Sequence, residues 1–293
     1  MSKKLNIIGQ VWGDSYDLIL KKPRLLFPLC IVAFLEALWL ELFYFAPRPP
    51  LNAFLLPPIK RFFGEAGEAA VHYPAYLFFL PKLFGYGQLL LYILIGGILT
   101  SVTMVMAVSE SENHPLRFSA AFKKVRHRLF ALILVSFSTT ALLGIVTGRE
   151  IAFFKMGFGF VGKGPLLQLL RLLTRLLAFL NFFIAIAVQT FVAFIFPFIV
   201  LGNQKFFPAI GKSFALGSQQ FRRVYLLLLL PMVCYGPLWM LKMKPAFLIR
   251  MTLYPELLVW LLGVGIIATV LVDTFVAVAI ALFFQRVRHE KSA

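Results

Sequence analysis

The sequence predicts an all-α, polytopic membrane protein with six transmembrane helices, built as three repeats of an interfacial amphipathic helix and a helical hairpin. Hydrophobic residues make up 60% of the 293-residue chain, whereas soluble domains contain about 45–50%. Six apolar stretches are long enough to cross a hydrocarbon core, which takes about 20 helical residues. A short segment that ends in a basic cluster precedes an apolar hairpin three times, and internal repetition of this kind predicts a repeated structural unit.

The whole chain, 1–293, is expected to form one membrane domain. The six expected spans are Leu25–Phe45, Tyr86–Val108, Leu129–Val146, Leu176–Leu201, Val224–Leu241 and Leu257–Phe284. Each is expected to be helical, because lipid offers no hydrogen-bond partner to an open backbone group. The three repeats and the basic cytoplasmic tail are then expected at 5–108, 113–202, 206–285 and 286–293.

Three amphipathic segments are expected to lie in the membrane interface, at Ile8–Arg24, Pro115–Arg128 and Pro208–Arg223. In the first, apolar residues share one helical face and the two aspartates fall largely elsewhere, which is typical of an interfacial helix. A solvated linker before each span is the alternative. Anionic lipid headgroups are the expected partners of the basic residues in these segments. These residues are Lys21, Lys22, Arg24, Lys123, Lys124, Arg126, Arg128, Arg222 and Arg223.

The distribution of Lys and Arg predicts the orientation. The side that holds both termini receives 17 of the 29 basic residues, and cytoplasmic segments are enriched in Lys and Arg. Both termini are therefore expected to be cytoplasmic. The net charge of +17 does not predict a nucleic-acid partner, because the basic residues lie beside apolar spans rather than in a separate basic patch.

Polar residues recur at a matching depth in the second helix of each hairpin. The fourth span contains Gln189-Thr190, the sixth contains Asp273-Thr274, and the second has the looser equivalent Thr100-Ser101. Small and hydroxylated residues let membrane helices approach closely. These three helices are therefore expected to meet at a quasi-threefold centre with a polar layer facing inward. With Glu36 of the first span, that predicted layer comprises Glu36, Gln189, Thr190, Asp273 and Thr274.

The ionisable residues near the middle of the expected spans, Glu36 and Asp273, have two possible interpretations. An Asp at a helix centre costs about 2.5–3.5 kcal/mol on insertion scales, so such residues usually face protein or water. Glu36 and Asp273 could form a proton or cation relay or contact a substrate, or they could be neutral packing residues. On the outer side, Arg171 and Arg175 could pair with Glu41 or extend to the headgroups.

Apparent catalytic motifs do not fit their usual context. Gly157–Gly164 contains both G-x-G-x-x-G and G-x-x-x-x-G-K, but no strand precedes it, and Gly164 stands where a Ser or Thr would hold magnesium. The four histidines lie in separate segments without metal-ligand spacing. No catalytic residue, cofactor or metal is expected, and the chain is not expected to be an enzyme. The Pro-rich, apolar loop 46–85 is the expected contact for a membrane or periplasmic protein partner.

The amphipathic segment VWGDSYDLILKKPRLLFPL followed by a span, in a chain with three such units, resembles a family of uncharacterised six-helix bacterial inner-membrane proteins. It is similar to the membrane domain fused to some glycerophosphodiester phosphodiesterases. The resemblance covers nearly the whole chain in layout and implies a bacterial inner-membrane location and a link to lipid or envelope metabolism. The phosphodiesterase domain has no counterpart in this sequence, so no catalytic residue is carried over.

Two functional hypotheses follow. The first is a non-enzymatic, lipid- or envelope-associated scaffold or accessory protein, motivated by the basic interfacial segments. The alternative is a small transporter or channel that uses the polar layer at the centre of the bundle, since sites near the bilayer midplane are common in transporters built from repeats. A membrane enzyme has the least support, because no nucleophile or general base is identified.

Overall fold

The computed structural model describes residues 2–54, 57, 61, 76–157, 180–242 and 256–292. Within these ranges every regular element is a helix, which confirms the all-α prediction. Five helical stretches are long and apolar enough to cross a membrane, and they fit a multi-pass membrane protein. They are Pro23–Phe45, Leu83–Ser111, Phe118–Val146, Leu180–Val200 and Leu257–Glu290.

The N-terminal unit is a helix, a tight turn and a second helix. Helix α1 (Ser2–Lys21) ends before the 3₁₀ segment η1 (Pro23–Leu26), and α2 (Phe27–Phe45) follows directly. The single expected helix over Ile8–Arg24 is therefore interrupted. Proline lacks an N–H and disfavours the helical conformation in the residue before it, and Lys22 accordingly adopts φ −134° and ψ 69°.

The second hairpin helix begins earlier than expected. Helix α4 (Tyr76–Leu91) continues through a π-helical segment, η2 (Tyr92–Gly96), into α5 (Gly97–Ser111). Residues 76–85, expected in an outer loop, are thus helical. Pro81 lies inside α4. A proline usually ends or kinks a helix, but α4 continues beyond it. Helix α5 ends in a turn in which Asn113 has a positive φ of 59°.

A short helix precedes a long one at two further places along the chain. Helix α6 (Phe118–Val125) and the 3₁₀ segment η3 (Arg126–Arg128) lead into α7 (Leu129–Gly157). Helix α10 (Phe206–Gln219) leads into α11 (Phe221–Lys242), and the last helix is α13 (Leu257–Ser292). Helix α11 covers the expected fifth span but is not among the five membrane candidates.

The fourth expected span is helical but broken. Residues 180–192 are helical, a turn follows at 193–194, and helix α9 (Ile195–Val200) completes the stretch. Pro197 accounts for the break, because it has no N–H to donate to the carbonyl of Ala193 four residues earlier.

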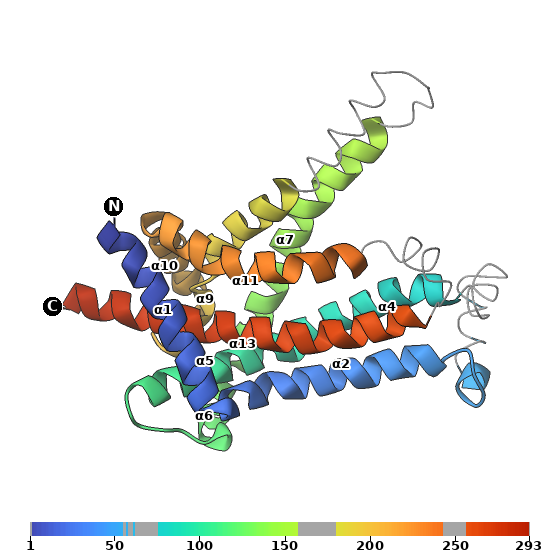
Figure 1. Cartoon of the computed structure of the whole chain (residues 1–293), viewed down its shortest axis with the longest axis horizontal. Helices are drawn as coiled ribbons and strands as arrows, with labels where there is room; N and C mark the ends of the chain where they lie inside the picture. The colour runs from blue at the N-terminus through green and yellow to red at the C-terminus, as the bar shows by residue number, and fades with distance from the viewer. Residues whose placement is uncertain are drawn as a thin grey trace.

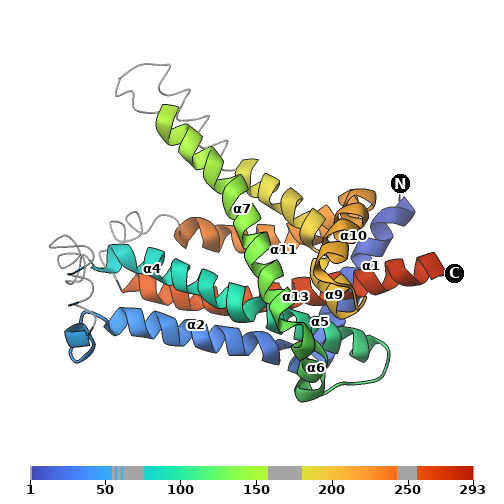
Figure 2. The ribbon, with the colours of Figure 1, turned by 180° about the vertical axis from the view of Figure 1, so that it is seen from behind.

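The long helices form a bundle with the short helices at one end. Helix α2 packs against α4 and α13, and α13 packs against α5 and α11. In Figure 1 both termini lie at the same end, together with α1, α6 and α10. Helix α7 and the helical residues after 180 extend away from the α2–α4–α13 group (Figure 2).

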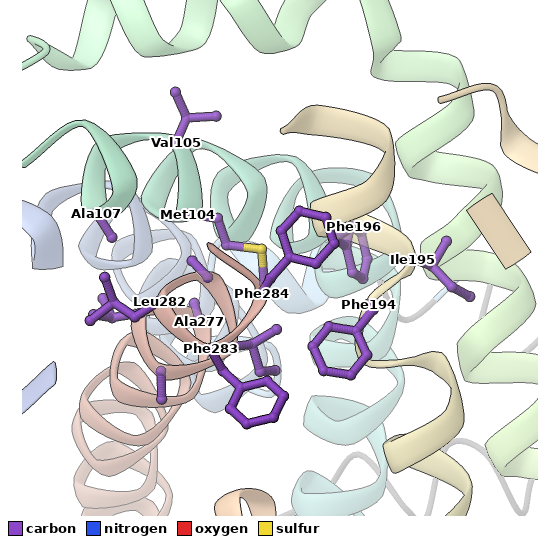
Figure 3. Packing of buried hydrophobic residues seen from close by; sticks show 14 of the residues in the cluster. Met104, Val105, Ala107, Phe194, Ile195, Phe196, Ala277, Leu282, Phe283 and Phe284 are labelled. Atoms are coloured by element: carbon purple, nitrogen blue, oxygen red, sulfur yellow. The ribbon is translucent and has the colours of Figure 1, made fainter. Parts of the chain in front are cut away.

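The main core lies where α5, α9 and α13 meet. Met104, Phe194 and Phe283 are almost completely buried there, and the rings of Phe194 and Phe283 stack with their centroids 5.9 Å apart. Figure 3 shows the side chains of Met104 on α5, Phe194 just before α9 and Phe283 on α13. The buried faces of α1, α6 and α10 add to the same cluster through Val11, Val125, Ala209 and their neighbours.

The outer faces of the long helices are apolar and exposed. On α13, Trp260 and Ile267 are 74% and 65% exposed, and Phe34 on α2 is 62% exposed. Large exposed apolar surfaces are rare on soluble monomers and mark contact with lipid or protein. The exposed faces therefore fit helices surrounded by hydrocarbon.

Candidate functional site

A cavity of about 640 Å³ lies within the bundle. Its described walls come from α2, α4, η2, α5, α7, residues 189–196, α11 and α13. Most of the lining is apolar, with Leu29, Leu143, Met232 and Ile280 among the wall residues. A volume in the 300–1,000 Å³ range with a mainly apolar wall and a few polar groups is typical of small-molecule sites.

Close helix approaches position the walls. A Cβ atom added to Gly87 of α4 would lie 1.3 Å from Nε1 of Trp39 on α2, and one added to Gly97 of α5 would lie 1.9 Å from Oγ of Ser136 on α7. A larger residue at either contact would require the Trp39 or Ser136 side chain to move. The two glycines thus permit the close approach of α4 to α2 and of α5 to α7, beside the cavity.

Glu36 is the carboxyl group on the α2 wall. The residue is 4% exposed, and its Oε2 accepts a hydrogen bond from Nε2 of Gln88 on α4 at 3.1 Å. Both residues line the cavity. A buried carboxyl needs hydrogen-bond partners to offset its lost hydration, and Gln88 supplies one without adding a charge.

Asp273 is the carboxyl group on the α13 wall. It is partly buried, lines the cavity, and interacts electrostatically with Glu36 and with Tyr92 of η2. Among the residues that the structure describes, no hydrogen bond or ion pair is formed by its carboxyl group. The carboxyl groups of Glu36 and Asp273 therefore line the same, mainly apolar cavity.

The predicted polar layer divides between the cavity and the core. Glu36, Gln189 and Asp273 line the cavity. Thr190 and Thr274 are fully buried outside it. The Thr190 hydroxyl donates to the carbonyl of Ile186 at 2.9 Å, while the Thr274 hydroxyl has no hydrogen-bond partner within the described ranges.

Each of three polar residue pairs has one member at the cavity and one in the packed interior. In each pair the first residue lines the cavity and the second is fully buried: Thr100-Ser101, Gln189-Thr190 and Asp273-Thr274. Successive residues of an α-helix are rotated by about 100°. One residue of each pair can therefore face the cavity while the next packs between helices.

Several cavity residues were missed by the sequence prediction. They are Gln88, Tyr92, Thr139, Thr140, Tyr235 and Thr269. A signal for two of them exists, because Glu36, Thr140 and Tyr235 each lie eleven residues beyond the first residue of an expected span, at Leu25, Leu129 and Val224. Aligning the repeats by their span starts would therefore have found Thr140 and Tyr235.

Two backbone irregularities border the cavity. The π-helical segment η2 contributes Tyr92 and Gly96, and the break in the fourth stretch contributes Val192 and Ala193. π-Bulges occur frequently at functional sites, and discontinuous helices form the substrate sites of many transporters.

The basic residues of the interfacial segments divide into two groups. Arg24 pairs with the buried Glu110 of α5, Arg128 donates to the carbonyl of Gln204 at 2.6 Å and to the side chain of Asn203, and Arg223 donates to Gln220 at 3.0 Å.

These three arginines therefore connect helices or turns of the protein itself. Lys22, Lys123, Lys124, Arg126 and Arg222 are exposed. Lys21, also exposed, pairs with Asp17 at 3.5 Å on its own helix.

Some predicted features fall outside the described residues. These are Arg171, Arg175, most of the Gly157–Gly164 segment and much of the loop 46–85. Within the described ranges, no group of three or more His, Cys, Asp or Glu side chains could hold a metal ion. The cavity is therefore the feature on which the function can be argued.

Comparison with known proteins gives no match. No family model, no curated protein and no solved structure matches the chain. The resemblance to the membrane domain of some glycerophosphodiester phosphodiesterases stays a prediction, and the functional argument depends on the cavity and its residues.

Proposed function

We propose that the chain crosses the bacterial inner membrane six times, with both termini in the cytoplasm. Helix α11 has 22 residues and is about 33 Å long at 1.5 Å per residue, enough for a hydrocarbon core of about 30 Å. Counting α11 makes the number of crossings even, which agrees with both termini lying at one end (Figure 1). The excess of Lys and Arg at that end supports a cytoplasmic position.

The register of the cavity residues supports three repeats of an interfacial helix and a hairpin. Glu36, Thr140 and Tyr235 each lie eleven residues after the first residue of an expected span, and all three line the cavity. On the second helices, the first residue of each polar pair (Thr100, Gln189 and Asp273) also lines the cavity. Equivalent positions that face one space are expected when repeats surround a common axis.

Within this architecture the protein is a transporter or channel for a small solute. The observation that carries this proposal is the cavity of about 640 Å³ that is lined by Glu36, Gln189 and Asp273, each on a candidate membrane-spanning helix. Each intramembrane carboxyl costs about 2.5–3.5 kcal/mol to insert, a cost that a purely structural scaffold has no need to bear. The role is binding and passage of a solute rather than chemistry on it.

Solute flux into proteoliposomes tests this function. The probes are three labelled solutes that cross bare lipid slowly: benzyltrimethylammonium, benzenesulfonate and mannitol. At least one should enter faster than into protein-free liposomes, and Glu36→Gln and Asp273→Asn should slow its entry about tenfold. The matched controls are Glu41→Gln and Glu290→Gln, at exposed sites outside the cavity lining on the same two helices. Flux no faster than in empty liposomes, or equal effects of site and control variants, would refute the proposal.

Contact with anionic lipid is a second candidate function, favoured by the exposed basic residues of the interfacial segments. Each basic residue near an anionic surface contributes about 1 kcal/mol of attraction. Replacing Lys123, Lys124 and Arg126 with Gln should reduce the phosphatidylglycerol that copurifies with the protein, measured by mass spectrometry. Arg48→Gln, an exposed arginine beyond the other end of α2, is the control. Unchanged lipid in the triple variant would exclude a lipid-holding role for this cluster.

A further inference from the structure

We propose that the cavity binds an organic cation, an ammonium group carried on a small apolar body. This inference depends on the solute site proposed above and names its ligand class. Charge, cavity size and aromatic lining support it separately.

The charged groups that the structure describes in the cavity lining are all acidic. Glu36 and Asp273 are the ionisable carboxyls in the described lining, and no Lys or Arg side chain is part of that lining. The hydrogen-bond partner of Glu36 on α4, Gln88, is neutral. A carboxylate in a low-dielectric space attracts a cationic ligand and repels an anionic one.

The cavity is too large and too apolar for a bare metal ion. Calcium takes six to eight oxygen ligands at about 2.3–2.6 Å, and among the described residues no group of three or more His, Cys, Asp or Glu side chains could hold a metal ion. A volume of about 640 Å³ with leucine, methionine, valine and isoleucine in its wall instead fits a ligand with an apolar body. The carboxyl groups would hold the charged end of that ligand.

Two tyrosine rings complete the arrangement. Tyr92 of η2 and Tyr235 of α11 both line the cavity. Tyr92 also interacts electrostatically with Asp273, so an aromatic ring and a carboxyl group lie close to the same space. Ammonium groups bind over aromatic faces, and aromatic side chains grouped around a space recognise quaternary ammonium ligands.

Equilibrium binding to the intact protein in lipid nanodiscs tests the inference, with empty nanodiscs as the blank. Isothermal titration would compare three probes that share a phenyl ring: benzyltrimethylammonium, benzenesulfonate and benzyl alcohol. A fourth titration with magnesium chloride tests an inorganic cation. Benzyltrimethylammonium should bind saturably and at least about tenfold more tightly than benzenesulfonate or benzyl alcohol.

Variants connect this binding to the named groups. Asp273→Asn and Glu36→Gln should each weaken benzyltrimethylammonium binding about tenfold, whereas Glu41→Gln and Glu290→Gln should not change it. If the carboxyl variants fail to fold, Tyr92 provides a second test. Tyr92→Phe keeps the ring and should bind at least about threefold more tightly than Tyr92→Leu.

Each outcome decides the inference, and it can fail independently of the proposed function. Preferred binding of benzenesulfonate, benzyl alcohol or magnesium would overturn the inference, as would ammonium binding that the carboxyl and ring variants leave unchanged. Flux of mannitol or benzenesulfonate without ammonium binding would refute the ligand class and leave transport standing. Ammonium binding at Asp273 without any flux would support the ligand class and refute transport.

Discussion

Substituting Gly87 tests whether the contact between α2 and α4 holds the cavity wall. A Cβ atom at this position would lie 1.3 Å from Nε1 of Trp39, so the indole would have to withdraw by about 2 Å to reach ordinary van der Waals contact. Trp39 also packs edge-on against Phe43, with ring centroids 4.9 Å apart, which restricts this movement. Overpacking of this kind costs about 1–3 kcal/mol, and we expect the upper end. Alanine regains about 1 kcal/mol of helix propensity over glycine, which leaves a net loss of about 2 kcal/mol for Gly87→Ala.

The free energy of unfolding in mixed micelles, followed by circular dichroism during titration with dodecyl sulfate, measures this loss. Gly85→Ala on the same helix is the matched control, because an added Cβ meets nothing within 4 Å there and the variant should be as stable as the wild type or slightly more stable. Trp39→Leu should relieve the overlap, so the double variant should be less destabilised than the sum of the single variants by about 1 kcal/mol or more. If Gly87→Ala were as stable as Gly85→Ala, the described packing of α4 on α2 would be wrong.

Three further predictions concern the contacts that tie the bundle together. Arg24→Ala should lower stability by about 1–2 kcal/mol, reduced from a fully buried pair because Arg24 is 43% exposed, and adding Glu110→Gln should restore part of that loss in the same unfolding assay. Ser213→Ala should cost about 1 kcal/mol by removing the 2.7 Å hydrogen bond to the carbonyl of Phe191, whereas an unchanged midpoint would mean that α10 is held by apolar contacts alone. Gly97→Leu should reduce folded yield severalfold, measured by size-exclusion chromatography, because an added Cβ overlaps a serine hydroxyl of α7.

The local pattern of apolar and polar residues was enough to predict the all-α membrane class and the positions of most helices. Continuous apolar stretches predicted long helices, and the amphipathic pattern placed short helices before α2, α7 and α11. Two errors in helix boundaries came from proline. Pro23 divides the first expected amphipathic helix into α1 and η1, and Pro81 made residues 76–85 resemble a loop although they are helical. A proline within an apolar helix surrounded by other helices is tolerated more readily than in a solvated one.

Contacts between residues far apart in the chain could not be predicted from the local sequence pattern. Arg24 was expected to face lipid headgroups, whereas it pairs with Glu110, which lies 86 positions along the chain. Arg128 similarly binds Asn203 and Gln204. A basic residue beside a span has the same neighbours in sequence whether it faces lipid or pairs within the protein. The partners of Arg24 and Arg128 reach them only through the packing of α5 and the turn before α10.

The cavity shows why the predicted polar layer contained two kinds of residue. Asp273 and Thr274 are adjacent on α13, but a rotation of about 100° turns the first toward the cavity and the second into the packed interface between helices. The same rotation separates Gln189 from Thr190. Within the predicted layer the carboxyl and amide groups thus line the cavity, while Thr190 and Thr274 lie where their small size permits close helix packing. The cavity wall is therefore the part of the predicted layer on which the proposed solute site depends.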